Sequence, residues 1–89
     1  MKNLKIKVTG KVQGVWFRAN TKNEADKLGL HGFVRNEPDS SVYIEVSGDD
    51  DAVNAFLERV KHGPELARVE EVIIAENDKA YDNGFEIRR

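Results

Sequence analysis

Apolar and polar side chains alternate along several short stretches of the chain, a pattern typical of strands with one buried face. Residues 3–9 and 42–46 show it most clearly, and the second of these runs on to Gly48. A strand is also predicted for 32–36, and because turn-forming residues fill the short gap before Val42, these two strands should form a hairpin. Two further strands are predicted around apolar positions near the end of the chain: Val69, Val72 and Ile74, then Phe85 and Ile87.

Two segments show the 3.6-residue spacing of amphipathic helices instead. The first covers 17–28 and meets a natural stop at Gly29. The second should begin at Asp49–Asp51, where carboxylates favour the N-cap and first turn, and should end at Gly63–Pro64. The apolar faces of the two helices contain Phe17, Thr21, Ala25 and Leu28, and Ala52, Val53, Phe56, Leu57 and Val60.

The predicted order is β-α-β-β-α-β with one more short strand. This order favours a ferredoxin-like α+β sandwich (βαββαβ), in which both helices cover one face of an antiparallel sheet. At 89 residues, the chain 1–89 is expected to be a single domain. No cysteine, signal-peptide pattern or long apolar run is present. We therefore expect a cytoplasmic protein without a membrane partner, and a monomer because no further apolar stripe is left exposed.

Charge is distributed unevenly along the chain. Residues 1–27 hold seven basic and two acidic side chains, a net +5, so the remainder carries −7 to give the total of −2. That total argues against a nucleic-acid partner. The basic third contains a turn between Gly10 and Gly14, followed by Arg18 as the first helical pattern begins. Free N–H groups at a helix start, beside a guanidinium, favour a phosphate. Neither a Walker A pattern nor a dinucleotide fingerprint is present.

Two segments resemble the paired signatures of the acylphosphatase family. Residues 8–18 (VTGKVQGVWFR) resemble the first, and 32–36 (GFVRN), followed by Val42 and Gly48, resemble the second. The resemblance implies an enzyme that hydrolyses the carboxyl-phosphate bond of acyl phosphates, with no metal and no cofactor. It also implies that inorganic phosphate is both a product and a competitive ligand.

The resemblance further implies a role for each site residue. Arg18 would bind the phosphoryl group and Asn36 would hold the attacking water, while Thr21 is treated as supporting. Main-chain amides of the loop would complete the phosphate site: Gln13, Gly14, Val15, Trp16, Phe17 and Arg18. One departure stands out, because the family has a glycine where this chain has Ser40. Glycine there suggests a positive φ, which would strain a serine by about 1–2 kcal/mol; a differently shaped turn is the alternative.

Several residues have simpler structural interpretations. His31 and His62 lack partners at metal-ligand spacing and are expected to be surface or hydrogen-bonded side chains. Phe17 is expected in the core. The role of Trp16 stays open, and one position for it is the rim of the site, where the acyl part of a substrate would lie. The alternative function is a non-catalytic ferredoxin-like module that binds an anion or a partner. Such a module would need Arg18 but would have no use for Asn36.

Overall fold

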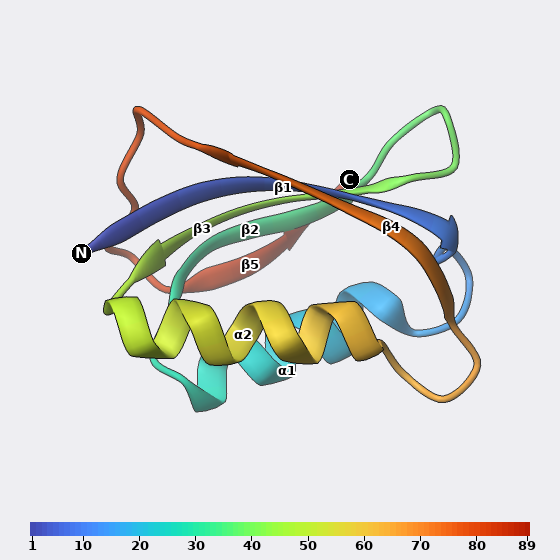
Figure 1. Ribbon diagram of the computed structural model, residues 1–89, viewed down its shortest axis with the longest axis horizontal. Coiled ribbons are helices and arrows are strands. Elements are labelled where there is room, and N and C mark those ends of the chain that lie inside the picture. The colour runs from blue at the N-terminus through green and yellow to red at the C-terminus, as the bar shows by residue number, and fades with distance from the viewer.

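The computed structural model describes residues 1–89, and its elements follow the order expected from the sequence. They are β1 (Lys2–Lys11), α1 (Phe17–Lys27), β2 (His31–Asn36), β3 (Val42–Gly48), α2 (Asp50–His62), β4 (Arg68–Glu76) and β5 (Phe85–Arg88). Both helices cover the same face of the sheet (Figure 1). The ferredoxin-like prediction is therefore confirmed. Neither helix has the length and hydropathy needed to span a membrane.

The sheet has the strand order β4-β1-β3-β2-β5. Its first four strands pair antiparallel, as predicted, whereas β5 lies parallel to β2 at the edge. The parallel direction arises because the chain crosses from β4, at one edge of the sheet, to the opposite edge before β5 begins. This crossing places the last residues of the chain beside α1, a proximity that strand periodicity does not predict.

The core forms where the alternating strand residues meet the apolar faces of the helices. Ile6 and Val8 on β1 pair with Ile44 and Val42 on β3, and all four side chains are fully buried. Phe17 of α1 is also buried, as predicted. Burying an aliphatic or aromatic side chain contributes about 1.5–3 kcal/mol, so this layer stabilises the sheet and fixes the start of α1 against it.

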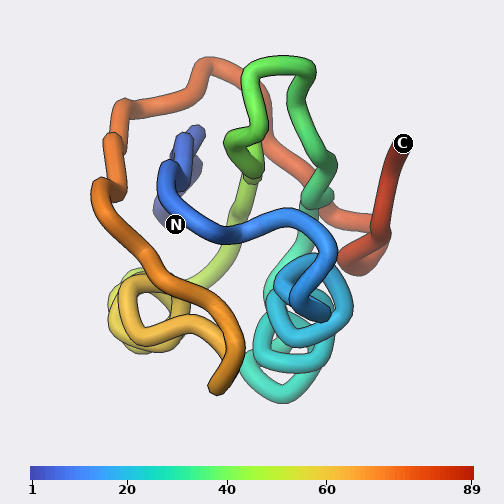
Figure 2. The backbone as a smooth tube through the Cα atoms, turned by 90° about the vertical axis from the view of Figure 1, so that its right-hand side faces the viewer, coloured from blue at the N-terminus to red at the C-terminus, as the bar shows by residue number.

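Three connecting segments come together at one end of the sheet (Figures 1 and 2). They are the loop between β1 and α1, the turn between β2 and β3, and the end of β5. In the tube view of Figure 2, the blue loop, the green turn and the red C-terminal segment lie on the same side of the molecule, above and beside α1. Segments that carry the two sequence signatures are thus brought to one place.

Ser40 adopts the left-handed conformation, with φ of 76°. The prediction of a positive φ at the position of the family's glycine is confirmed. The surrounding turn is held by the Ser40 N–H, which donates to the Glu37 carbonyl at 3.2 Å, and by the Glu37 N–H, which donates to the Ser41 carbonyl at 2.9 Å. The Ser40 side chain is exposed and makes no hydrogen bond of its own.

We expect Ser40→Gly to raise the melting temperature. Relief of the positive-φ strain gains about 1–2 kcal/mol, and the greater freedom of glycine in the unfolded chain removes about 0.5–1 kcal/mol. The net gain of about 0–1.5 kcal/mol corresponds to a rise of about 3–6 °C at the middle of that range for a domain of this size. Differential scanning calorimetry measures the shift, and turnover of an acyl phosphate should remain within twofold. A lower melting temperature would contradict this account of the turn.

Candidate active site

The loop between β1 and α1 depends on two glycines and two buried valines. Gly10 has φ of 119° at a bulge where β1 pairs with β4, and a Cβ there would lie 2.1 Å from the Arg68 carbonyl oxygen. Gly14 has φ of 71°. Val12 and Val15 are buried and anchor the loop on both sides of Gly14. The loop is therefore a defined turn with a fixed path into α1.

Main-chain N–H groups of this loop are left without partners. None of the N–H groups of residues 13–16 donates a hydrogen bond to the rest of the protein. Trp16, the N-cap of α1, has φ of 64° and provides no side-chain cap, and the first turn of α1 contains no acidic residue. The second helix differs, because Asp50 and Asp51 lie in its first turn. Free donors at the positive end of a helix dipole favour an anion at α1.

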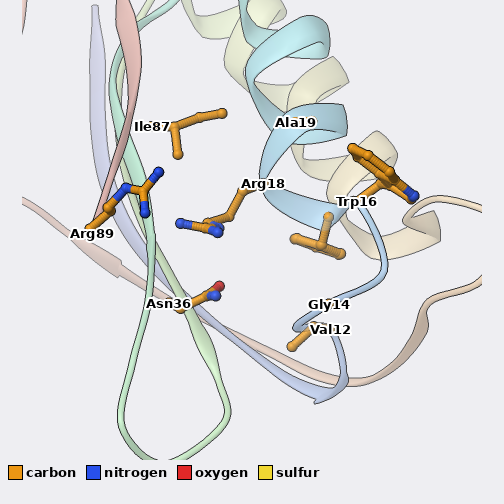
Figure 3. A pocket seen from close by; sticks show the side chains of 9 residues that line it. Val12, Gly14, Trp16, Arg18, Ala19, Asn36, Ile87 and Arg89 are labelled. Atoms are coloured by element: carbon orange, nitrogen blue, oxygen red, sulfur yellow. The ribbon is translucent and has the colours of Figure 1, made fainter.

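A cavity of about 450 Å³ opens beside this loop. Figure 3 shows its lining side chains, with those of Arg18, Asn36 and Arg89 converging on one region while the Trp16 indole extends away from them. The cavity is lined by Val12, Gly14, Trp16, Phe17, Arg18, Ala19, Asn36, Ile87 and Arg89. Sequence positions 18 and 36, which come from separate signatures, therefore share one cavity.

Arg18 lies in the first turn of α1 with its guanidinium directed into the cavity (Figure 3). Its Nη1 donates to the Arg88 main-chain carbonyl at 3.5 Å, and no carboxylate pairs with it. Arg89 adds a second guanidinium to the same cavity, again without an ion pair. Two unpaired cationic side chains, with no Asp or Glu among the lining residues, make the cavity electropositive, as a phosphate site requires.

Asn36 ends β2 and places its carboxamide opposite Arg18 (Figure 3). Its Oδ1 atom is buried and accepts no hydrogen bond from the protein. An unpaired buried acceptor costs about 1–3 kcal/mol of stability, so such atoms are rare unless another molecule supplies the donor. The arrangement thus leaves a buried hydrogen-bond acceptor without a donor, on a residue that lines the same cavity as the Arg18 cation.

The remaining predicted site residues take different positions. Gly14, Trp16 and Phe17 line the cavity with Arg18, and the 77% exposed Trp16 indole is at its rim. Val15 is buried in the core. Thr21 does not line the cavity; its buried hydroxyl donates to the Phe17 carbonyl at 2.8 Å.

Four cavity residues were not among the predicted site residues. Val12 and Ala19 directly flank the predicted loop in the sequence, whereas Ile87 and Arg89 come from the end of the chain. The only available signal for these last two was the alternation of Phe85 and Ile87, which predicts a strand but not its neighbour. Their position depends on the parallel pairing of β5 with β2, which is a long-range choice of partner.

The other chemically suggestive residues lie outside this cavity. His31 accepts a hydrogen bond at Nδ1 from the Gly84 N–H at 2.8 Å, which confirms it as a satisfied side chain. Asp49 is the N-cap of α2, as predicted, although its side chain makes no capping hydrogen bond. No group of three or more His, Cys, Asp or Glu side chains is arranged to hold a metal ion. Burial and the adjacent Glu45 carboxylate raise the pKa of Tyr43 to about 12, but both residues lie on the helix-free face of the sheet.

Comparison with known proteins identifies the family of this chain. The acylphosphatase family model matches residues 4–87. An acylphosphatase of Thiobacillus denitrificans is 49% identical over 88 residues, which cover 99% of this chain and 98% of that protein. The crystal structure of acylphosphatase from Bacillus subtilis superposes with a TM-score of 0.95 at 35% identity and full coverage of both chains. An acylphosphatase from Coxiella burnetii gives a TM-score of 0.92 at 31% identity, covering 98% of this chain and 92% of that one. The chain therefore belongs to the acylphosphatase family of enzymes.

Proposed function

We propose that the cavity hydrolyses acyl phosphates to a carboxylate and inorganic phosphate, with Arg18 binding the phosphoryl group and Asn36 holding the attacking water. A bond forms between the water oxygen and phosphorus as the bond from phosphorus to the acyl oxygen breaks. The bonding electrons leave with the carboxylate. Both water protons end on the released phosphate, which therefore departs as the monoanion when the substrate phosphoryl group is a dianion.

The reactivity of acyl phosphates supports these separate roles for Arg18 and Asn36. A carboxylate is a stable leaving group that needs little protonation, and phosphoryl transfer through a loose transition state demands little of the nucleophile. Charge stabilisation and alignment are therefore the main requirements. The Arg18 guanidinium and the unpartnered N–H groups of residues 13–16 would stabilise the charge of the phosphoryl group. Asn36 would align the attacking water.

One observation supports the water-holding role above the others. The buried Asn36 Oδ1 has no donor within the protein, and Asn36 lines the same cavity as Arg18. A water that donates to this oxygen would turn a lone pair toward a phosphoryl group held at Arg18. A neutral carboxamide is not basic, so the proton passes to a phosphate oxygen rather than to Asn36. A module that only binds anions would gain nothing from this costly acceptor.

Benzoyl phosphate provides a direct test, since its hydrolysis can be followed by ultraviolet absorbance. Wild-type protein should hydrolyse it in the presence of a chelator, and Arg18→Ala protein should not exceed the uncatalysed rate appreciably. Absence of hydrolysis by the folded wild-type protein, with inorganic phosphate still bound, would identify the chain as an anion-binding module instead.

We expect kcat to be nearly independent of pH between about pH 6 and 9. Arginine stays protonated throughout this range, and no Asp, Glu, His, Lys or Cys side chain lines the cavity. The profile is measured with benzoyl phosphate at saturating concentration, after correction for spontaneous hydrolysis. A bell-shaped kcat profile with an apparent pKa near that of histidine or a raised carboxyl would contradict the proposed mechanism.

A further inference from the structure

The Gln13 side chain makes two hydrogen bonds that a phosphate-binding main-chain N–H at this residue would not need. Its Nε2 atom donates to the Glu37 carbonyl oxygen at 2.8 Å and to the Ser41 carbonyl oxygen at 2.8 Å. A primary amide has two N–H groups, and both are used here. Because both partners are carbonyl acceptors, only the NH₂ end of the carboxamide can face them.

These two carbonyls lie at the two ends of the turn between β2 and β3. The Glu37 carbonyl also accepts from the Ser40 N–H, and the Ser41 carbonyl also accepts from the Glu37 N–H. The turn contains the positive φ of Ser40, so its backbone is held in a strained shape. Gln13 therefore hydrogen-bonds to the turn at Glu37, the residue that directly follows Asn36.

No other side-chain hydrogen bond joins residues 12–16 of the loop to residues 37–41 of the turn. A separate ion pair also holds the turn, in which Lys7 Nζ of β1 lies 2.7 Å from Asp39 Oδ2. That ion pair is exposed and neither side chain forms a hydrogen bond or ion pair with the loop, so it contributes little to the alignment of the cavity. The loop carries the free amides of the phosphate site, and the turn carries the end of β2 with Asn36. Gln13 alone links the two by side-chain hydrogen bonds.

We infer that Gln13 is a positioning residue whose side chain sets the distance and angle between the phosphate loop and Asn36. This inference rests on the proposed function, because it concerns the alignment of the water against the bound phosphoryl group. Gln13 touches neither the water nor the phosphate through its carboxamide, and it acts through the backbone of the turn. Small displacements of reacting groups, on the order of 1 Å, cost up to about 100-fold in rate.

The test replaces Gln13 with methionine, which has a similar length and no donor. We expect kcat for benzoyl phosphate to fall about 10- to 100-fold while the inhibition constant of inorganic phosphate stays within twofold. Lys7→Met is the matched control, because it removes a contact to the same turn without touching the loop, and its kcat should match the wild type. If Gln13→Met does not fold, Gln13→Asn retains the amide but is one methylene too short to reach, and it should show the same pattern.

A double-mutant cycle with Asn36→Ala identifies the route of the effect. If Gln13 acts through Asn36, adding Gln13→Met to Asn36→Ala should lower turnover by less than twofold more. Unchanged kcat in both folded Gln13 variants, loss of phosphate binding in parallel with kcat, or full additivity in the cycle would each overturn the inference. These results are distinct from failure of the proposed function, in which Arg18→Ala and Asn36→Ala themselves retain wild-type turnover.

Discussion

Replacing Arg18 with alanine is expected to abolish nearly all turnover and to weaken phosphate binding. The guanidinium is the cation at the start of α1, and no carboxylate neutralises it. Arginines that stabilise phosphoryl-transfer transition states contribute about 10³- to 10⁵-fold to the rate, so a loss of at least about 10³-fold in kcat/KM is expected. Inorganic phosphate should bind about tenfold or more weakly, since a charge-assisted hydrogen bond contributes about 1.5–3 kcal/mol. Benzoyl phosphate kinetics and calorimetric titration with phosphate measure the two effects.

Two further variants make the Arg18 experiment specific. Arg59→Ala removes the same charge from α2, where Arg59 pairs with Glu24 away from the cavity, and should leave turnover unchanged. Arg18→Lys retains the charge but loses the planar guanidinium and its paired N–H donors. This variant should bind phosphate better than Arg18→Ala and should still hydrolyse benzoyl phosphate slowly. Wild-type turnover in Arg18→Ala would contradict the proposed site.

The second large effect is expected at Asn36. Asn36→Ala should lower kcat by at least about 10²-fold, because water is no longer aligned with the phosphoryl group. Its inhibition constant for inorganic phosphate should stay within about threefold of the wild type, since Arg18 and the loop amides remain. The same kinetic assay with phosphate as a competitive inhibitor measures both values.

The folding stability of the Asn36 variant gives an independent readout. Removing a buried acceptor that has no partner relieves a desolvation cost, so the melting temperature should not fall. Asn54→Ala is the control, because Asn54 is an exposed residue of α2 whose side chain accepts only from Lys2. An Asn36→Ala protein that hydrolyses benzoyl phosphate at nearly the wild-type rate would refute the assignment of the water site.

The contrast between these two variants separates binding from catalysis. Arg18 is expected to affect both phosphate affinity and turnover, whereas Asn36 is expected to affect turnover alone. Gln13, although it contacts neither reactant through its side chain, is expected to resemble Asn36 more closely than Arg18. The expected effects differ because Arg18 would contact the phosphoryl group directly, whereas Asn36 and Gln13 would only orient the attacking water.

Local sequence patterns predicted the elements well because their causes are local. The alternation of Val42, Ile44 and Val46 requires a strand with one buried face, and the structure buries all three. Phe17, Thr21 and Ala25 recur at helical spacing, and they form the buried face of α1. The positive φ of Ser40 was predicted from a family resemblance, because a turn of a given shape constrains the backbone whatever residue occupies it.

Other features depend on pairings between distant segments and were not predicted. The Gln13 carboxamide meets carbonyls 24 and 28 residues away, and nothing in the pattern around residue 13 identifies them. Similarly, Ile87 and Arg89 reach the cavity because β5 pairs parallel with β2, and a four-residue strand does not specify its partner or direction. Long-range register and strand order are set by the whole core.

By itself, the sequence determined the order of strands and helices, the glycine-flanked loop and the family signatures that nominate Arg18 and Asn36. These depend on periodicity, backbone freedom and residue chemistry, which act over a few neighbouring positions. Only the tertiary structure decided that Asn36 Oδ1 is buried without a partner opposite Arg18, that Gln13 ties the loop to the turn, and that β5 closes the cavity. The reason is that burial and hydrogen-bond pairing across the sheet depend on how all the elements pack together.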